Sequence, residues 1–252
     1  MNITLLVNYD LASALALNYL LPNLANHRLF VYFTQKHAQT TLEPLSKLAQ
    51  FEKKSLFDLK SNQQHTSIEN LSKHTSSPIK RLNKVNTDDL EQIRLCVPDL
   101  IICIRHMTIL KKAVIDLPKY GVINLHSGLL PSYQGVMASF WAMLNNEKMI
   151  GTTLHFIEDS TIDTGAIISQ SRQICDYSKS YLWNVFSIYK TGCRMILKTV
   201  EIIDGEGSIQ SVEQTADAQY FSFPTETDLT MFAQSGNTLF NQKDIIDFQL
   251  TD

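Results

Sequence analysis

The sequence has few of the features that would indicate a nucleic-acid-binding or membrane protein. Its 22 Lys and Arg are fewer than its 25 Asp and Glu, so a formal net charge of −3 leaves no basic excess to neutralise a run of phosphates. A secretory signal begins with basic residues, but the first basic residue here is Arg28. The apolar stretch after Leu11 is interrupted by Asn18 and Pro22, so it is not expected to span a membrane. We therefore expect a cytoplasmic protein with no nucleic-acid or membrane partner.

Cysteine pairs and nucleophile motifs are also missing. The four cysteines are widely spaced and form no C-x-x-C, which favours reduced core cysteines over disulfide bonds or zinc. No cluster of His, Cys and carboxylate residues has the spacing of metal ligands, so no metal is expected. The G-x-S-x-G pattern of a serine nucleophile is absent as well.

Short apolar runs alternate with helical patterns along most of the chain. The nearly all-apolar run at 99–104 is typical of a strand covered on both faces of a sheet. The alternation predicts an α/β fold with an open, mostly parallel sheet and helices on both faces, in which ligands bind at the carboxyl ends of the strands. The expected strands are 3–7, 29–33, 99–104, 121–126 and 152–157, with an extended segment at 166–169, and the expected helices are 11–19, 40–59, 87–98, 111–117, 138–147 and 180–203.

Two polar side chains stand together in the strand at 121–126. Successive side chains of a strand point to opposite faces, so Asn124 and His126 project from one face while Leu125 points away. Asp163 lies in the loop after the following strand, and in a parallel sheet that loop would reach the same edge. We therefore expect a carboxamide, an imidazole and a carboxylate to converge.

Such a trio suits acyl transfer to an amine. Asn124 and His126 could stabilise the oxyanion of a tetrahedral intermediate. His126 is the expected general base, and Asp163 either positions it, makes it more basic or relays a proton through water. Each residue also has a structural interpretation: Asn124 as a turn cap, His126 as a core histidine, and Asp163 as an Asx-turn residue. Arg105 and His106, just past an apolar strand, either line the same cleft or end that strand with solvated polar groups.

Residues 162–166, Ile-Asp-Thr-Gly-Ala, also match the short signature of an aspartic protease. That chemistry needs two facing carboxylates on β-rich lobes. Only one copy is present, and the alternation of strands and helices does not fit such lobes, so the protease interpretation is disfavoured.

The same segments resemble the catalytic core of folate-dependent formyltransferases, which include the methionyl-tRNA, glycinamide ribonucleotide and sugar-nucleotide N-formyltransferases. Asn124-Leu125-His126, Leu129-Leu130-Pro131 with Gly135, and Asp163-Thr164-Gly165 carry the resemblance, preceded by Pro98-Asp99-Leu100-Ile101-Ile102. It is specific over about residues 98–170 and compatible over 1–97. Ser127 departs from the Pro that many members have in this turn.

The resemblance implies a Rossmann-like domain that uses 10-formyltetrahydrofolate as its formyl donor and Asn124, His126 and Asp163 as its catalytic residues. It also implies that two loops hold the folate, largely through backbone contacts. The cofactor-binding residues expected on this basis are Met107, Thr108, Ile109, Leu110, Ile157, Glu158, Asp159 and Ile162. Arg105 and His106 are added to them because of their place just past the apolar strand.

The chemical class of the formyl acceptor is inferred by elimination. The first loop, Asn8-Tyr9-Asp10-Leu11, lacks the glycines with which the ribonucleotide enzymes grip a phosphate, and a short C-terminal part without a basic balance disfavours tRNA. A small amine is therefore expected, best an amino sugar that is nucleotide-linked or free. The alternatives are a hydrolase releasing formate from 10-formyltetrahydrofolate and a non-catalytic folate- or nucleotide-binding module. The first strand begins at Ile3, without the extra N-terminal domain common in those hydrolases, which favours transfer.

The two ends of the chain are expected to differ in role. Residues 1–205 are expected to form the formyltransferase catalytic domain, with a polar surface connection at 61–78. Residues 206–252 are too few for a core of their own. We expect them to form a C-terminal appendage that makes a homodimer contact or touches the acceptor.

Overall fold

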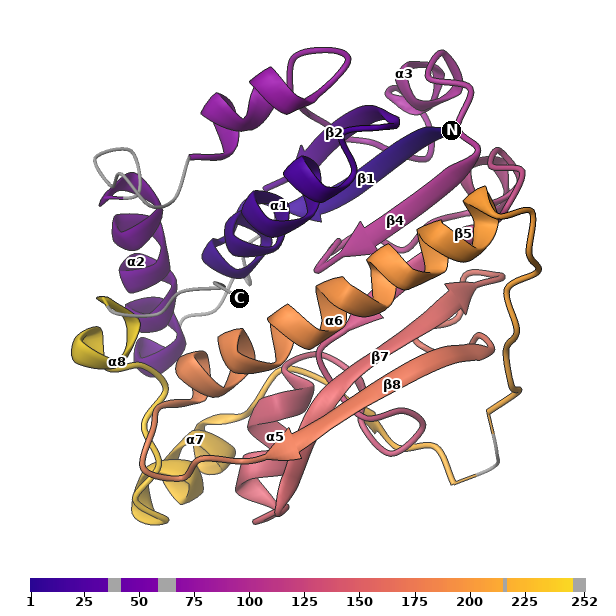
Figure 1. Ribbon diagram of the computed structural model, residues 1–252. Coiled ribbons are helices and arrows are strands. Elements are labelled where there is room, and N and C mark those ends of the chain that lie inside the picture. Colours follow the sequence, from indigo (N-terminus) through magenta and orange to yellow (C-terminus); the bar gives the residue numbers. More distant parts are fainter. Residues whose placement is uncertain (36–41, 59–66, 215–216, 247–252) are drawn as a thin grey trace.

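A seven-stranded sheet forms the centre of the computed structural model, which describes residues 1–35, 42–58, 67–214 and 217–246 (Figure 1). The strand order is β3-β2-β1-β4-β5-β7-β8, and the first five strands in this order are parallel, whereas β7 is antiparallel to both of its neighbours. The α/β fold with a mostly parallel sheet is thus confirmed. The strands are β1 (Asn2–Asn8), β2 (Arg28–Thr34), β3 (Lys80–Arg81), β4 (Leu100–Ile104), β5 (Val122–His126), β7 (Met149–Ile157) and β8 (Ile167–Ile174).

Helices cover both faces of this sheet. Alternate residues of β4 pack into two separate apolar clusters, with Ile102 on one face and Cys103 on the other, which explains its unbroken apolar run. On the first face lie α1 (Leu11–Asn23) and α6 (Tyr181–Asp204). The short helices α3 (Leu90–Arg94) and α4 (Lys112–Ile115) pack on the second face.

The β1–α1 junction is fixed by a helix cap. Asp10 is the N-cap of α1, and its carboxylate accepts a hydrogen bond from the backbone N–H of Ser13 at 2.9 Å. On the same face α6 approaches β5 closely at Gly192, where a Cβ atom would lie 2.9 Å from Leu125. The first contact fixes α1 at the end of β1, and the second allows α6 to pack closely on β5.

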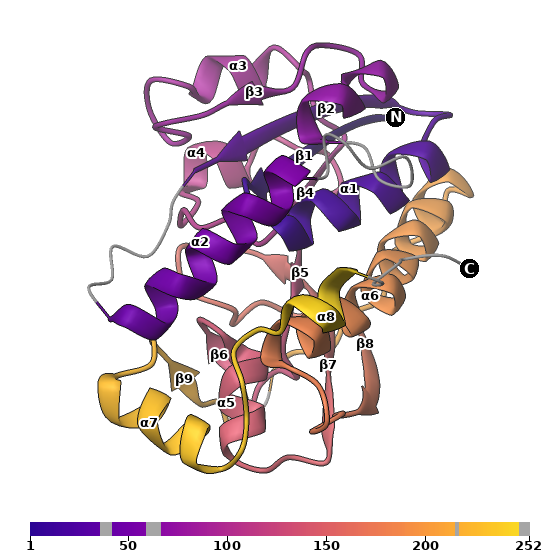
Figure 2. The same ribbon diagram turned by 90° about the vertical axis from the view of Figure 1, so that its left-hand side faces the viewer.

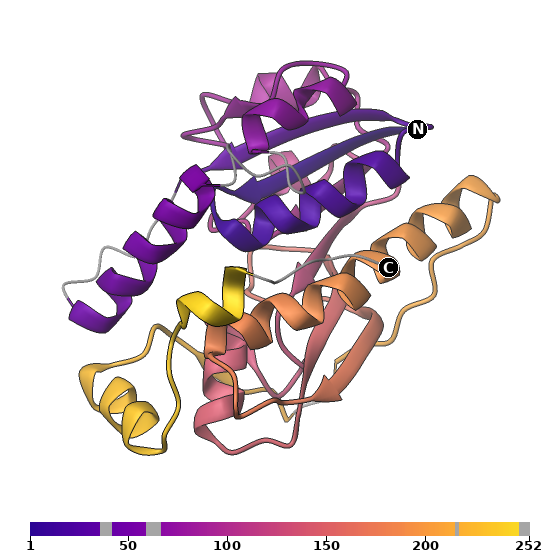
Figure 3. The same cartoon turned by 60° about the vertical axis from the view of Figure 1, so that its left-hand side comes forward.

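The remaining elements lie around this sheet. One of them is α2 (Glu43–Asp58), which lies at the same end of the molecule as α8 (Gln242–Ile246) (Figures 2 and 3), and its Phe51 stacks on Phe240, just before α8, with ring centroids 4.6 Å apart. The others are the 3₁₀-helix η2 (Ile68–His74), β6 (Gln134–Gly135), α5 (Ala138–Leu144), β9 (Tyr220–Phe221) and α7 (Glu226–Gln234). Among the described residues, no helix is long and apolar enough to cross a membrane.

Some expected boundaries differ from the observed ones. The helix expected at 87–98 is reduced to α3, and the extended segment at 166–169 is part of a longer strand, β8. Within the polar stretch at 61–78, residues 61–66 lie outside the described residues, while η2 follows directly and buries Ile68 and Leu71. Two apolar side chains among many polar ones gave too weak a period to predict that helix.

The C-terminal residues share the main core. From α7, Leu229 and Phe232 are buried, and the ring of Phe232 stacks on Phe140 of α5 with centroids 4.4 Å apart. Farther upstream, β9 pairs with β6 in a small parallel sheet. The segment is therefore packed against the domain through side chains as well as through backbone hydrogen bonds.

Replacing Phe232 by alanine tests how much this packing contributes. Because the side chain is 1% exposed, F232A should lower the free energy of unfolding by about 3–5 kcal/mol. Its neighbour Met231 is 50% exposed, so M231A should change the value by no more than about 0.5 kcal/mol. Urea unfolding at equilibrium measures both. Equal stabilities of the two variants would show that α7 does not contribute to the core.

Candidate functional site

A carboxamide and an imidazole project from one face of β5. Leu125 between them is buried in the main core, while Asn124 and His126 both contact Asp163. The Nε2 atom of His126 lies 2.7 Å from the carbonyl oxygen of Tyr133, which can only accept, so Nε2 carries the hydrogen. Nδ1, 3.4 Å from Asp163 Oδ2, is therefore the nitrogen left to accept a proton.

Asp163 reaches this face by a different route from the one expected. The sequence predicted a parallel strand before its loop, but β7 runs antiparallel to β5, with Ile157 opposite Val122. The loop at 158–166 thus starts beside the amino end of β5 and folds back over the sheet. The prediction that Asp163 lies near the other two residues is correct, whereas the reason for it was wrong.

A second histidine, which the sequence did not single out, completes the cluster. His155 lies on β7 opposite Asn124, is 1% exposed, and has its Nε2 3.0 Å from the amide nitrogen of Asn124 and 3.4 Å from Asp163 Oδ1. Its Nδ1 donates to the carbonyl of Phe156 at 2.7 Å. The signal available was a polar residue inside an apolar strand, two residues from Thr153 on the same face.

The amide nitrogen of Asn124 has one strong and one weak partner. The contact with His155 is 3.0 Å long, whereas the contact with Asp163 Oδ1 is 3.4 Å, beyond the usual N–H···O range. The second amide hydrogen is therefore the one available to a ligand oxygen. His155, by holding the first, orients the carboxamide.

The Asp163 carboxylate is largely shielded from water and ionised. Burial alone would raise its pKa, but His126, His155 and the backbone N–H of Gly135, which donates at 2.9 Å, outweigh it and lower the pKa from 3.8 to about 2. A carboxylate that stays charged with its side chain 11% exposed can stabilise an imidazolium at His126.

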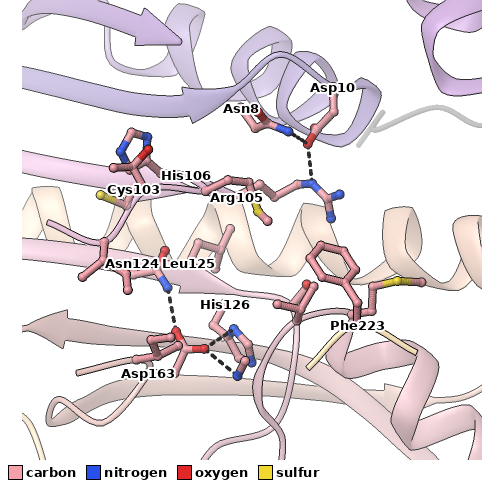
Figure 4. Close-up of a pocket in the computed structure, with 18 of the residues that line it drawn as sticks. Asn8, Asp10, Cys103, Arg105, His106, Asn124, Leu125, His126, Asp163 and Phe223 are labelled. Carbon is pink, nitrogen blue, oxygen red and sulfur yellow. Dashed lines mark hydrogen bonds and ion pairs between the residues drawn. The ribbon is translucent and has the colours of Figure 1, made fainter. Parts of the chain in front are cut away.

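A second polar cluster lies across the cavity (Figure 4). Arg105, just after β4, donates to Asp10 at 2.7 Å, and Asn8 donates to the same carboxylate oxygen at 3.0 Å. Burial would raise the pKa of Asp10, but Arg105 lowers it. Nearby, Glu52 of α2 has its Oε1 buried without a hydrogen-bond partner, and desolvation raises its pKa to about 7.

The two clusters face a cavity of about 380 Å³. Its other walls come from the loops after β4 and β7, which touch where the Ser160 hydroxyl donates to the Leu110 carbonyl at 3.3 Å. Of the residues expected to bind the cofactor, those that line the cavity are Arg105, His106, Met107, Thr108, Ile109, Leu110, Ile157, Asp159 and Ile162.

Glu158 does not line this cavity. Its carboxylate instead accepts a hydrogen bond from the backbone N–H of Ala166 at 3.0 Å, so it closes the base of the loop. Glu52 and Tyr181, which the sequence did not single out, line the cavity together with Phe223 of the C-terminal part, and the three come from distant parts of the chain.

The profile of the formyl transferase family matches residues 45–180, and the chain belongs to that family. Over 125 residues it is 34% identical to the methionyl-tRNA formyltransferase of Fusobacterium nucleatum, a match that covers 50% of this chain and 40% of that protein. The chain thus matches less than half of that relative's length.

Solved structures of the family share the fold. The N-formyltransferase from Helicobacter canadensis, in complex with folinic acid and dTDP-3-aminofucose, is 20% identical with a TM-score of 0.59, covering 89% of this chain and 71% of that one. For the glycinamide ribonucleotide transformylase 1 from Symbiobacterium toebii the identity is 14% and the TM-score 0.60, covering 84% and 93%.

The depressed pKa of Asp163 predicts an acid-dependent loss of stability. Because the folded protein favours the ionised form, the stabilisation is complete above about pH 4 and is lost as the pH falls toward 2, a total of about 2 kcal/mol. Asp163→Asn lacks this titration. The difference in unfolding free energy between wild type and D163N, measured in urea from pH 6 to pH 2, should therefore shrink by that amount. A difference independent of pH would contradict the assigned pKa.

Proposed function

We propose that this chain transfers a formyl group from 10-formyltetrahydrofolate to the amine of an amino sugar, free or nucleotide-linked. The observation that carries the proposal is the convergence of Asn124, His126 and Asp163 at the wall of one cavity, with an orienting histidine behind them. A carboxamide donor, a proton acceptor and a buried carboxylate are the groups that acyl transfer to nitrogen requires.

The donor fits between the loops after β4 and β7. Met107, Ile109 and Ile162 are 37%, 52% and 37% exposed, and all three line the cavity, so an apolar surface is available for a flat aromatic ring. Backbone groups of the same loops can bind the ring's polar edge. The folate, when bound there, supplies the formyl carbon.

The residues of β5 and of the loop at 158–165 have different roles in the transfer. Asn124 donates a hydrogen bond to the formyl oxygen, where negative charge develops, through the amide hydrogen that makes only the weak contact with Asp163. His126 accepts the proton of the attacking amine at Nδ1, and Asp163 stabilises the imidazolium that results. The imidazolium would return this proton to the nitrogen of the donor as its bond to the formyl carbon breaks, so that tetrahydrofolate leaves and His126 is neutral again. His155 holds the carboxamide of Asn124 in the orientation that this donation needs.

The cluster across the cavity supports an acceptor rich in hydroxyl groups. Arg105 is paired with Asp10 through its Nε, whereas Glu52 has an oxygen without a partner and a pKa of about 7. A carboxyl group that exists in both forms near neutral pH can accept from a hydroxyl or donate to it. Sugars offer such groups beside their amine.

An acceptor panel tests the proposal. Purified protein with 10-formyltetrahydrofolate should release tetrahydrofolate in the presence of dTDP-3-aminofucose or a free amino sugar, and much more slowly without an amine. Formate release that ignores the amine would replace the proposal by a hydrolase. Formylation of methionyl-tRNA alone would replace the amino sugar by the substrate named for the Fusobacterium relative.

Single substitutions should separate chemistry from acceptor binding. Asn124→Ala removes the oxyanion donor and should lower kcat about a hundredfold to a thousandfold, with His126→Ala at least as damaging. Glu52→Gln keeps its shape and should mainly raise the KM of the sugar. Circular dichroism confirms folding in each case. If N124A and H126A kept the wild-type kcat, the assigned site would be wrong.

A further inference from the structure

The chain after α6 returns to the site and is fixed there at two points. Val212 exchanges two backbone hydrogen bonds of 2.8 Å with Ile167 at the start of β8. Farther on, Gln134 donates its backbone N–H to the Gln219 carbonyl at 2.9 Å, beside the pairing of β6 with β9. These bonds place residues 212–214 and 217–221 beside the loop that holds Asp163.

Between these two points, the side chain of Gln214 forms hydrogen bonds with the backbone of the 158–165 loop. Its side-chain nitrogen donates to the carbonyl oxygens of Asp163 and Gly165, at 2.7 and 2.8 Å. Its side-chain oxygen accepts from Gln134 Nε2 at 3.2 Å, and the same Gln134 nitrogen lies 3.2 Å from the Asp163 carbonyl. Both amide side chains therefore hold the backbone of the residue whose carboxylate faces His126.

The loop needs such support. Asp163 has a φ of +55°, in the left-handed region that side chains other than glycine rarely adopt. Gly165 is pressed so close to Phe156 that a Cβ atom would lie 2.1 Å from its carbonyl oxygen. The contacts of Asp163 with His126 and His155 are each 3.4 Å long, so a small displacement of the loop would break them.

We propose that Gln214 is a positioning residue, which holds the 158–165 loop so that the Asp163 carboxylate faces His126 and His155. The C-terminal segment is then part of the site although it contributes no reacting group. The kinetic consequence rests on the proposed function, whereas the effect on the titration of Asp163 does not.

Gln214→Met keeps the length of the side chain and removes both donated hydrogen bonds. The pKa of Asp163, followed by carbon NMR of the carboxyl in the free protein, should rise by about one unit toward 3.8 as its partners move away. With the amino sugar as acceptor, kcat should fall roughly ten- to a hundredfold with little change in KM. Gln214→Lys keeps a nitrogen donor and should restore part of kcat, while its positive charge lowers the pKa of Asp163 in any case.

Glu213→Gln is the matched control, because Glu213 is an exposed neighbour on the same segment. It should leave the pKa and kcat unchanged. If Q214M is too unstable to study, Gln134→Met removes the second amide and should shift the pKa in the same direction. An Asp163 pKa that stays at the wild-type value in folded Q214M would overturn the proposal, even if formyl transfer is confirmed. A raised pKa in a protein without formyl transfer would support positioning and reject the proposed function.

Discussion

The buried charge of Asp163 is the constraint on which the site depends. A carboxylate with so little exposure to water is costly unless donors surround it. Here the N–H donors are the backbone at Gly135 and, more weakly, Asn124 on β5, and the imidazoles of His126 on β5 and His155 on β7 stabilise the charge further. Each of these three parts of the fold has a fixed position in the folded protein. The carboxylate is therefore stabilised only when all three are correctly placed.

The change of strand direction at β7 makes this arrangement possible. An antiparallel neighbour sets His155 opposite Asn124, so that two polar side chains of adjacent strands meet on one face. It also sends the following loop away from the carboxyl end of β5, and the loop must return over the sheet to bring its carboxylate back. The parallel strands, by contrast, bring Asn8 and Arg105 to the far side of the same cavity.

The sequence could predict those features that follow from the local periodicity of apolar and polar residues. A period of two was enough to place Asn124 and His126 on one face, and the alternation of strands and helices was enough for the sheet. Strand direction is not encoded in such a period, which is why the expected route of the Asp163 loop was wrong. Glu52 and Gln214 were missed for a related reason, because their partners are distant in the chain and no local pattern marks either residue.

The return of residues 212–214 and 217–221 to the site also has a consequence for the order in which the molecule is made. During synthesis, the sheet up to β8 can form while the ribosome still holds the C-terminal part. The bonds from Val212, Gln214 and Gln219 do not yet exist at that stage. A nascent chain therefore carries Asn124, His126 and Asp163 before Gln214 can bind the backbone of the 158–165 loop.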